Sequence, residues 1–449
     1  MLLPLWPLVL LTPHLPGLPK PSVNGLPWRQ ELALCLLLTA TIGFLFLKKK
    51  APVPEVRIDR STLAVLAAGV FFAFWILGSS AWATDTYPAI HLGLQWTIYL
   101  IFFALMILAT SPKLVRSSFI ILAVVIWILA IACALESWFG APLTDFNLRN
   151  DLKPLLRGLS GFGEVMGPSC ILFAGFALYV RRRRAALICG LTALAGWLST
   201  IQSLERAPLL GTVAGFLLLL IGSFVRPRGR DLKRLGLLFT GFALVFLLQT
   251  GHLRYFLRSE APTDHISVVT RLQQHPATDA NAQVRFLFWG IALEMVRVHP
   301  LLGVGGNNYQ VKYPEARAQF AASNTNSPLL TANEDLLAGY AHNEYLQMLA
   351  ELGVVGFLLF VVFSFALVLS FWKALKVSRH KLAMLGAAGA MLAFAVSSGA
   401  SAASFRSLGG GLIFFFSGAL ICQRVNLDHT RSAISSKIRF TSLKLGILK

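Results

Sequence analysis

Residues 61–83, STLAVLAAGVFFAFWILGSSAWA, form an apolar run without a charged side chain. A helix needs about 20 such residues to cross the hydrocarbon core of a bilayer. Similar runs recur along the whole chain, and together they predict an all-α, polytopic integral membrane protein with about 12 transmembrane helices. We place the spans near residues 2–18, 31–47, 61–83, 90–110, 118–136, 166–180, 185–202, 208–225, 235–251, 352–372, 382–400 and 407–422.

The composition supports this fold class. Of 449 residues, 56% are hydrophobic and 13% are charged, whereas about 25% of residues are charged in an ordinary soluble domain. A soluble or disordered chain of this length is therefore excluded. Prolines interrupt the first run, 2–18, for which a removable signal peptide is the alternative interpretation. The five cysteines all lie in apolar runs, which indicates small packing side chains rather than disulfides or a metal site.

The net charge of +20 predicts the orientation of the chain. In a soluble protein this charge would suggest nucleic-acid binding, but membrane proteins concentrate Lys and Arg in their cytoplasmic segments. With a cytoplasmic N-terminus, six segments hold 26 of the 40 basic residues and 4 of the 20 acidic ones. We therefore expect membrane lipids and no nucleic acid as partners, and both termini in the cytoplasm. The six segments are 48–60, 111–117, 181–184, 226–234, 373–381 and 423–449.

The alternation of cytoplasmic and external segments along the chain predicts four parts. Residues 1–251 hold the first nine spans, 252–350 form a large external loop with amphipathic helices, 351–422 hold the last three spans, and 423–449 form a basic cytoplasmic tail. The inverted repeats of many transporters are not visible.

Two segments of the external loop have helical periodicity. The apolar residues of 281–300 fall on one face, which we expect to lie on the membrane surface with Arg285 opposite and Trp289 one turn later. The glycine-rich segment after Pro300 is expected to be a turn, because it matches neither a Walker loop nor GxGxxG. The apolar residues are Val284, Phe288, Ile291, Met295 and Val298.

A second helix is predicted to begin near Ala341 and to continue into the span 352–372. His342 then lies in its first turn, where the helix dipole disfavours the imidazolium. A neutral imidazole at a membrane surface suits a general base, with Asn343 and Tyr345 as supporting residues. The alternative is a helix-start histidine that bonds a neighbouring backbone group.

The segment STIQSLERAPLLGTV joins two spans with almost no loop, so Glu205 and Arg206 are expected at the outer membrane surface. An ionisable pair there is costly and suggests function, although a mutual salt bridge is the alternative. For Arg285 the alternative is an interfacial arginine that extends its charge to water. Arginines match phosphate oxygens, and no DxD, DxE or HExxH motif accompanies them. These residues indicate a metal-free site for a lipid-linked phosphate, with His342 activating an acceptor hydroxyl.

Three motifs together resemble the bacterial O-antigen ligase and O-antigen polymerase superfamily: SLERAPLLG at 203–211, HPLLGVGGNNY at 299–309 after Arg285 and Trp289, and AHNEYLQMLAELGVVG at 341–356. The resemblance implies a GT-C-type glycosyltransferase of the bacterial inner membrane with a periplasmic site. It further implies a glycan donor on undecaprenyl diphosphate and no metal or other cofactor. The family usually has Ser-Arg in the first motif, whereas this chain has Glu205 before Arg206.

By this resemblance Arg206 and Arg285 bind the diphosphate, and His342 is the catalytic base. Glu205, Trp289, Asn343 and Tyr345 are possible supporting residues. We expect a ligase whose acceptor is lipid A–core. A polymerase or a protein O-oligosaccharyltransferase of the same superfamily is the alternative, and a lipid-linked sugar transporter is the alternative from another class.

Overall fold

A computed structural model describes residues 2–14, 28–47, 58–108, 112–139, 161–203, 205–224, 229–249, 280–325, 327–331, 338–378, 380–401, 405–423 and 425. Predictions for the tail 426–449 and for 250–279 of the loop lie outside these residues. All regular structure within them is helical. The elements are η1 Leu3–His14, α1 Trp28–Leu47, α2 Arg60–Gly78, η2 Ser79–Ala81, α3 Thr86–Leu108, α4 Pro112–Phe139, α5 Phe162–Tyr179, α6 Arg183–Gln202, α7 Arg206–Phe224, α8 Gly229–Gln249, α11 Ala280–Val298, α12 Tyr309–Ser323, α13 Pro328–Thr331, α14 Glu344–Val377 and α15 Lys381–Ser398.

The described residues contain eight helices long and apolar enough to cross a membrane, namely α2 with η2, α3, α4, α5, α6, α7, α14 and α15. Ala33–Gly43 and Leu408–Gln423 are shorter apolar helices. The chain is therefore a polytopic membrane protein. The predicted run 235–251 lies largely in α8, and the first run contains η1, a 3-10 helix of 12 residues. Prolines lack an amide donor, which explains why this run does not form a regular α-helix.

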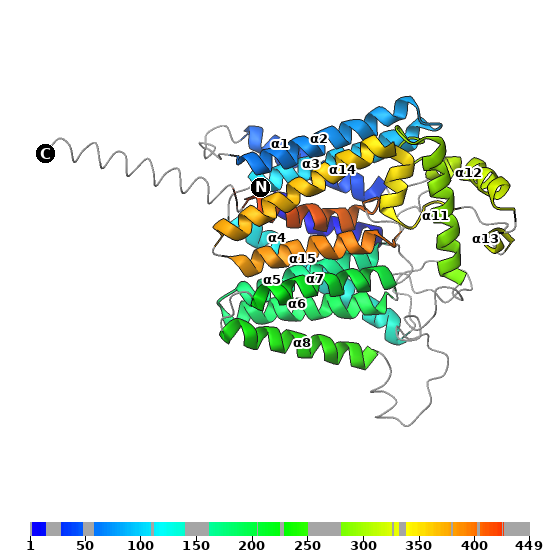
Figure 1. Cartoon of the computed structure of the whole chain (residues 1–449). Coiled ribbons are helices and arrows are strands. Elements are labelled where there is room, and N and C mark those ends of the chain that lie inside the picture. The colour runs from blue at the N-terminus through cyan, green and yellow to red at the C-terminus, as the bar shows by residue number, and fades with distance from the viewer. Residues whose placement is uncertain are drawn as a thin grey trace, which may run out of the picture.

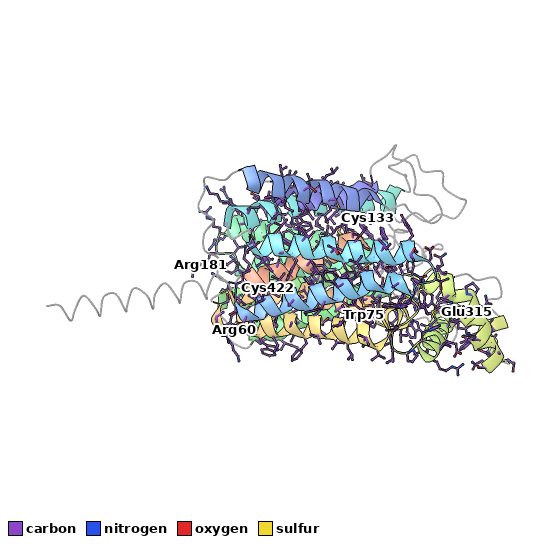
Figure 2. The ribbon with its side chains drawn as sticks, turned by 90° about the horizontal axis from the view of Figure 1, so that it is seen from above. Arg60, Trp75, Cys133, Arg181, Glu315 and Cys422 are labelled. Atoms are coloured by element: carbon purple, nitrogen blue, oxygen red, sulfur yellow. The ribbon has the colours of Figure 1, made fainter. Side chains whose placement is uncertain are left out.

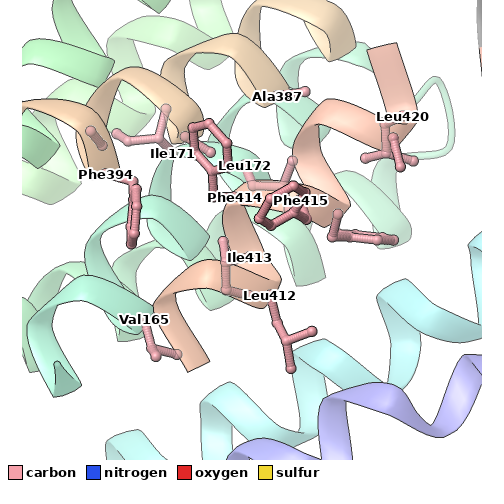
Figure 3. Close-up of a cluster of buried hydrophobic side chains, with 14 of the residues drawn as sticks. Val165, Ile171, Leu172, Ala387, Phe394, Leu412, Ile413, Phe414, Phe415 and Leu420 are labelled. Carbon is pink, nitrogen blue, oxygen red and sulfur yellow. The ribbon is translucent and has the colours of Figure 1, made fainter. Parts of the chain in front are cut away.

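The helices of the bundle run side by side, and α11, α12 and α13 lie across one end, called here the loop end (Figure 1). Figure 2 shows Arg60 and Arg181 at the opposite end from Glu315 of α12. Apolar side chains of α5, α15 and the helix Leu408–Gln423 fill the interior (Figure 3). Here α5 and α15 approach closely: a Cβ added to Gly175 would lie 2.4 Å from the Cα of Gly386. Small residues permit such backbone contact between helices in membranes.

Helix α14 is broken at Gly353, whose backbone has φ 67° and ψ −176°. The turn 300–305 lies in the break and bonds the amide groups that the helix no longer pairs. In addition, the indole of Trp75 donates to the carbonyl of Leu352 at 3.0 Å. The loop is thereby attached to the bundle through the backbone. The backbone bonds run from Val304 N to Ala350 O at 3.0 Å, Gly305 N to Glu351 O at 2.8 Å, Val354 N to Pro300 O at 2.9 Å and Val355 N to Leu301 O at 3.4 Å.

The apolar face of α11 packs inside the protein. Phe288, Ile291 and Met295 are buried in a cluster with residues of α12 and α14, and the hydroxyl of Tyr309 donates to the carbonyl of Phe288 at 2.8 Å. The prediction that this face lies on the membrane surface is therefore wrong. Periodicity identified the buried side of the helix, but the loop itself supplies the partners that bury it.

We predict that Gly353→Ala destabilises the attachment of the loop. An added Cβ would lie 2.1 Å from the carbonyl oxygen of Leu301, and a backbone with positive φ and ψ near 180° is essentially restricted to glycine, at a cost of about 1–3 kcal/mol for other residues. The thermal midpoint of the purified protein should fall. Gly236→Ala in α8 is the matched control, because nothing lies within 4 Å of its added Cβ and alanine favours a helix. Equal thermal midpoints for the two variants would contradict the conclusion that the break of α14 requires glycine at position 353.

Candidate active site

Glu205 and Arg206 lie in the short connection between α6 and α7, as predicted. Both side chains are half-buried, and Arg206 is the first residue of α7. The connection packs against the start of α5, where a Cβ on Gly163 would lie 2.9 Å from Oε2 of Glu205 and 2.7 Å from Cγ of Pro208. Gly163 thus leaves room for the carboxyl group at the loop end.

Arg285 of α11 is half-buried and influences the pKa of both Glu205 and His342 through its charge. It was expected opposite the apolar face, but it borders that face. Phe288, one turn later, stacks on the ring of His342 with centroids 5.8 Å apart and planes at 21°. Helix α11 therefore places a guanidinium and an aromatic ring next to the histidine.

His342 precedes α14 instead of lying in its first turn. The helix begins at Glu344, and the N-cap Asn343 accepts hydrogen bonds from the backbone N–H groups of Tyr345 at 3.1 Å and Leu346 at 3.2 Å. His342 has φ 53°, so it belongs to the chain reversal before the helix. The prediction that this helix begins near Ala341 was wrong, because a residue with positive φ leaves no signal in the apolar periodicity of the sequence.

Arg285 lies close enough to both Glu205 and His342 for its charge to act on the pKa of each. Burial, and then the charge of Arg285, lowers the pKa of His342 to about 4, so the imidazole is neutral near pH 7. Burial raises the pKa of Glu205 to about 7, although Arg285 and the backbone N–H of Gly163 act in the opposite direction. Arg206 follows Glu205 directly in the chain, as the first residue of α7.

The supporting residues lie around this group. The hydroxyl of Tyr345 donates to the carbonyl of Ala395 in α15 at 2.6 Å, which anchors the start of α14 to the bundle. Trp289 packs edge-on against Phe286 with centroids 5.6 Å apart. Its indole N–H is buried and has no hydrogen-bond partner in the described part of the chain.

Sequence reasoning missed Arg406. This residue precedes the helix Leu408–Gln423 and is buried, with ion pairs to Glu351 at 2.8 Å and Glu344 at 3.5 Å. The signal was an arginine at the edge of an apolar run, together with two acidic residues on one face of the predicted helix that leads into the span 352–372.

The group at the loop end has the chemistry of an anion and proton-transfer site. A half-buried guanidinium binds oxyanions, and a neutral imidazole accepts a proton. Within the described ranges, no three His, Cys, Asp or Glu side chains gather closely enough to hold a metal ion.

Residues 171–361 match the O-antigen ligase family. The matched segment contains Arg206, Arg285 and His342, and it ends before Arg406. No curated protein matches the chain.

We predict that Arg285→Met raises the pKa of His342 from about 4 towards the ordinary value of 6.5, because the neighbouring positive charge disfavours the imidazolium. The pH dependence of diethylpyrocarbonate modification, read by mass spectrometry on the peptide that contains His342, measures this shift. Arg297→Met is the control, since Arg297 lies on the same helix, is exposed and pairs with Glu294. An unchanged modification profile in Arg285→Met would show that the two side chains are not coupled.

Proposed function

Since residues 171–361 of this chain carry an O-antigen ligase family domain, we propose that the protein transfers a glycan from undecaprenyl diphosphate to a sugar hydroxyl of lipid A–core. The family implies transfer of a lipid-linked glycan; the acceptor is our proposal. The observation that carries it is the grouping of Arg285, Glu205 and a neutral His342 at one end of a membrane bundle.

In the proposed reaction Arg206 and Arg285 hold the diphosphate of the donor. Each guanidinium offers paired donors to phosphate oxygens. The acceptor oxygen attacks the anomeric carbon while the bond from that carbon to the diphosphate breaks, and the electron pair of the broken bond stays on the diphosphate. The arginines stabilise this charge, so the leaving group needs no proton. Inversion at the anomeric carbon follows from a single displacement.

His342 takes the proton of the acceptor hydroxyl in this mechanism. The imidazole is neutral because its pKa is lowered to about 4, so its free nitrogen is available at neutral pH. General-base catalysis by a positioned side chain contributes about 10²–10⁴-fold to a rate. Asn343 caps the helix that follows His342, and Tyr345 anchors that helix to α15.

Glu205 is proposed as the partner of Arg285 when no donor is bound. Its pKa is raised to about 7, so the carboxyl can take up a proton near neutral pH. The approach of a diphosphate would favour this protonation, because two anions would otherwise share one guanidinium. Trp289, with its unused indole N–H, is proposed to donate to the donor.

The proposed placement is the bacterial inner membrane with twelve crossings, cytoplasmic termini and a periplasmic site. The parts would be 1–251, 252–350, 351–422 and 423–449. The location of Arg60 and Arg181 at the end opposite α12 supports this orientation (Figure 2), because basic residues collect on the cytoplasmic side.

We predict that His342→Ala and Arg285→Ala each lower the rate of transfer by about 10²-fold or more while the protein still inserts into the membrane. Transfer is measured with purified protein in liposomes that contain the undecaprenyl-diphosphate-linked glycan and lipid A–core. Arg297→Ala, on the exposed side of α11, is the matched control and should retain the activity of the wild type. Full activity in His342→Ala or in Arg285→Ala would contradict the mechanism.

We predict that the acceptor requirement separates the candidates within the superfamily. With the donor as the sole substrate, a ligase forms no product until lipid A–core is added, whereas a polymerase forms a ladder of longer lipid-linked glycans. Transfer to serine or threonine of an added protein would indicate a protein O-oligosaccharyltransferase. Absence of product with every acceptor would contradict transferase function and favour the transporter.

A further inference from the structure

Arg406 joins three segments at the loop end. Its side chain is 3% exposed. Nη1 donates to Oδ1 of Asn307 at 2.7 Å, Nη2 donates to Oε2 of Glu351 at 2.8 Å, and Nη2 lies 3.5 Å from Oε1 of Glu344. A guanidinium this deeply buried is tolerated only when it is paired and hydrogen-bonded. Arg406 therefore holds the turn at Asn307 and the first turns of α14 against the segment that precedes the helix Leu408–Gln423.

Glu351 extends this contact towards His342. Its carboxylate accepts hydrogen bonds from the backbone N–H of Asn307 at 2.7 Å and from Nε2 of Gln347 at 2.9 Å. Oε1 of Gln347 in turn accepts from the backbone N–H of Ala341 at 3.0 Å. A continuous chain of hydrogen bonds thus runs from Arg406 to the residue that precedes His342.

Both ends of this chain are strained. Among the described residues, the non-glycine residues with positive φ are Asn307 at 55° and His342 at 53°. Such conformations are unfavourable for a non-glycine residue and persist where surrounding contacts impose them. Asn307 is bonded directly to Glu351 and Arg406, and His342 is flanked by Ala341, which bonds to Gln347. The network supplies the contacts that the two conformations require.

We propose that Arg406 is a positioning residue, which acts through Glu351 and Gln347 to hold the backbone of His342 and through Asn307 to hold the glycine-rich turn. It contacts neither the donor nor the acceptor, because its terminal nitrogens bond Asn307 and Glu351. The proposal rests on the proposed function for the role of His342. It adds a residue outside the matched segment 171–361.

The test uses the full-length protein in lipid, with Arg406→Gln as the main variant. Hydrogen–deuterium exchange should rise about tenfold in peptides 303–309 and 338–343, because Glu351 and Gln347, which accept from the amides of Asn307 and Ala341, are no longer held by Arg406. Exchange in α5 and α15 should stay unchanged. The turnover number for transfer should fall about 100-fold with a nearly unchanged KM for the donor, as expected for a displaced base. The acid limb of the pH profile should move upward by about one pH unit, because water then reaches His342.

Two further variants cover a folding failure of Arg406→Gln. The triple variant Glu344→Gln/Glu351→Gln/Arg406→Gln neutralises all three members of the buried ion pairs and should insert normally while it shows the same changes in exchange and in the pH profile. Arg406→Lys keeps the charge near Glu351 but loses the paired geometry, so it should restore part of the turnover number.

Lys373→Gln is the matched control, because it removes one positive charge from a pair with the buried Asp59 near the other end of α14. It should leave exchange in 338–343 and the pH profile unchanged. Unchanged exchange in Arg406→Gln and in the triple variant would overturn the proposal, and so would increased exchange throughout the bundle. Wild-type protein that transfers no glycan would overturn the proposed function instead, and the exchange data would still decide whether Arg406 holds the two segments.

Discussion

The loop end depends on the break of α14 at Gly353. A helix broken near a membrane surface leaves amide groups without partners, and each costs several kcal/mol unless another group bonds it. The turn 300–305 supplies these bonds, and two glycines allow it to approach. An added Cβ on Gly303 would lie 2.4 Å from the carbonyl oxygen of Glu351, and one on Gly353 would lie 2.1 Å from that of Leu301. Because α11 leads directly into this turn, the backbone bonds also determine where Arg285 lies.

Charged groups at the loop end separate into two sets with different exposure. Arg285 and Glu205 are half-buried, so part of each side chain is accessible to a ligand. Arg406 and Glu351 are buried and bonded to each other, and opening this pair would leave an uncompensated charge. Exposure therefore favours the first set for ligand binding, and the mutual bonds of Arg406 and Glu351 favour a structural role for the second set.

Hydropathy predicted most of the bundle, because a run of about 20 apolar residues has few alternatives to a span. The turn at Glu205 followed from the small gap between two such runs. The partner of the apolar face of α11 could not be predicted, since periodicity shows that a face is buried and not what covers it. The conformation of His342 was also hidden, because no residue-type pattern signals positive φ in histidine. Arg406 and Glu351 are 55 residues apart, and their pairing depends on how separate helices pack.

Burial, and to a smaller extent the charge of Arg285, lowers the pKa of His342, whereas the sequence predicted the helix dipole as the cause. A helix dipole is permanent, whereas the charge of Arg285 can be offset by a ligand. In the proposed mechanism the donor places a diphosphate beside Arg285, which reduces the positive potential at His342 and raises its pKa from about 4. The imidazole then becomes a stronger base only when a donor is present. In the proposed mechanism the charge of Arg285 thus links occupancy of the donor site to activation of the acceptor, a dependence that burial alone would not provide.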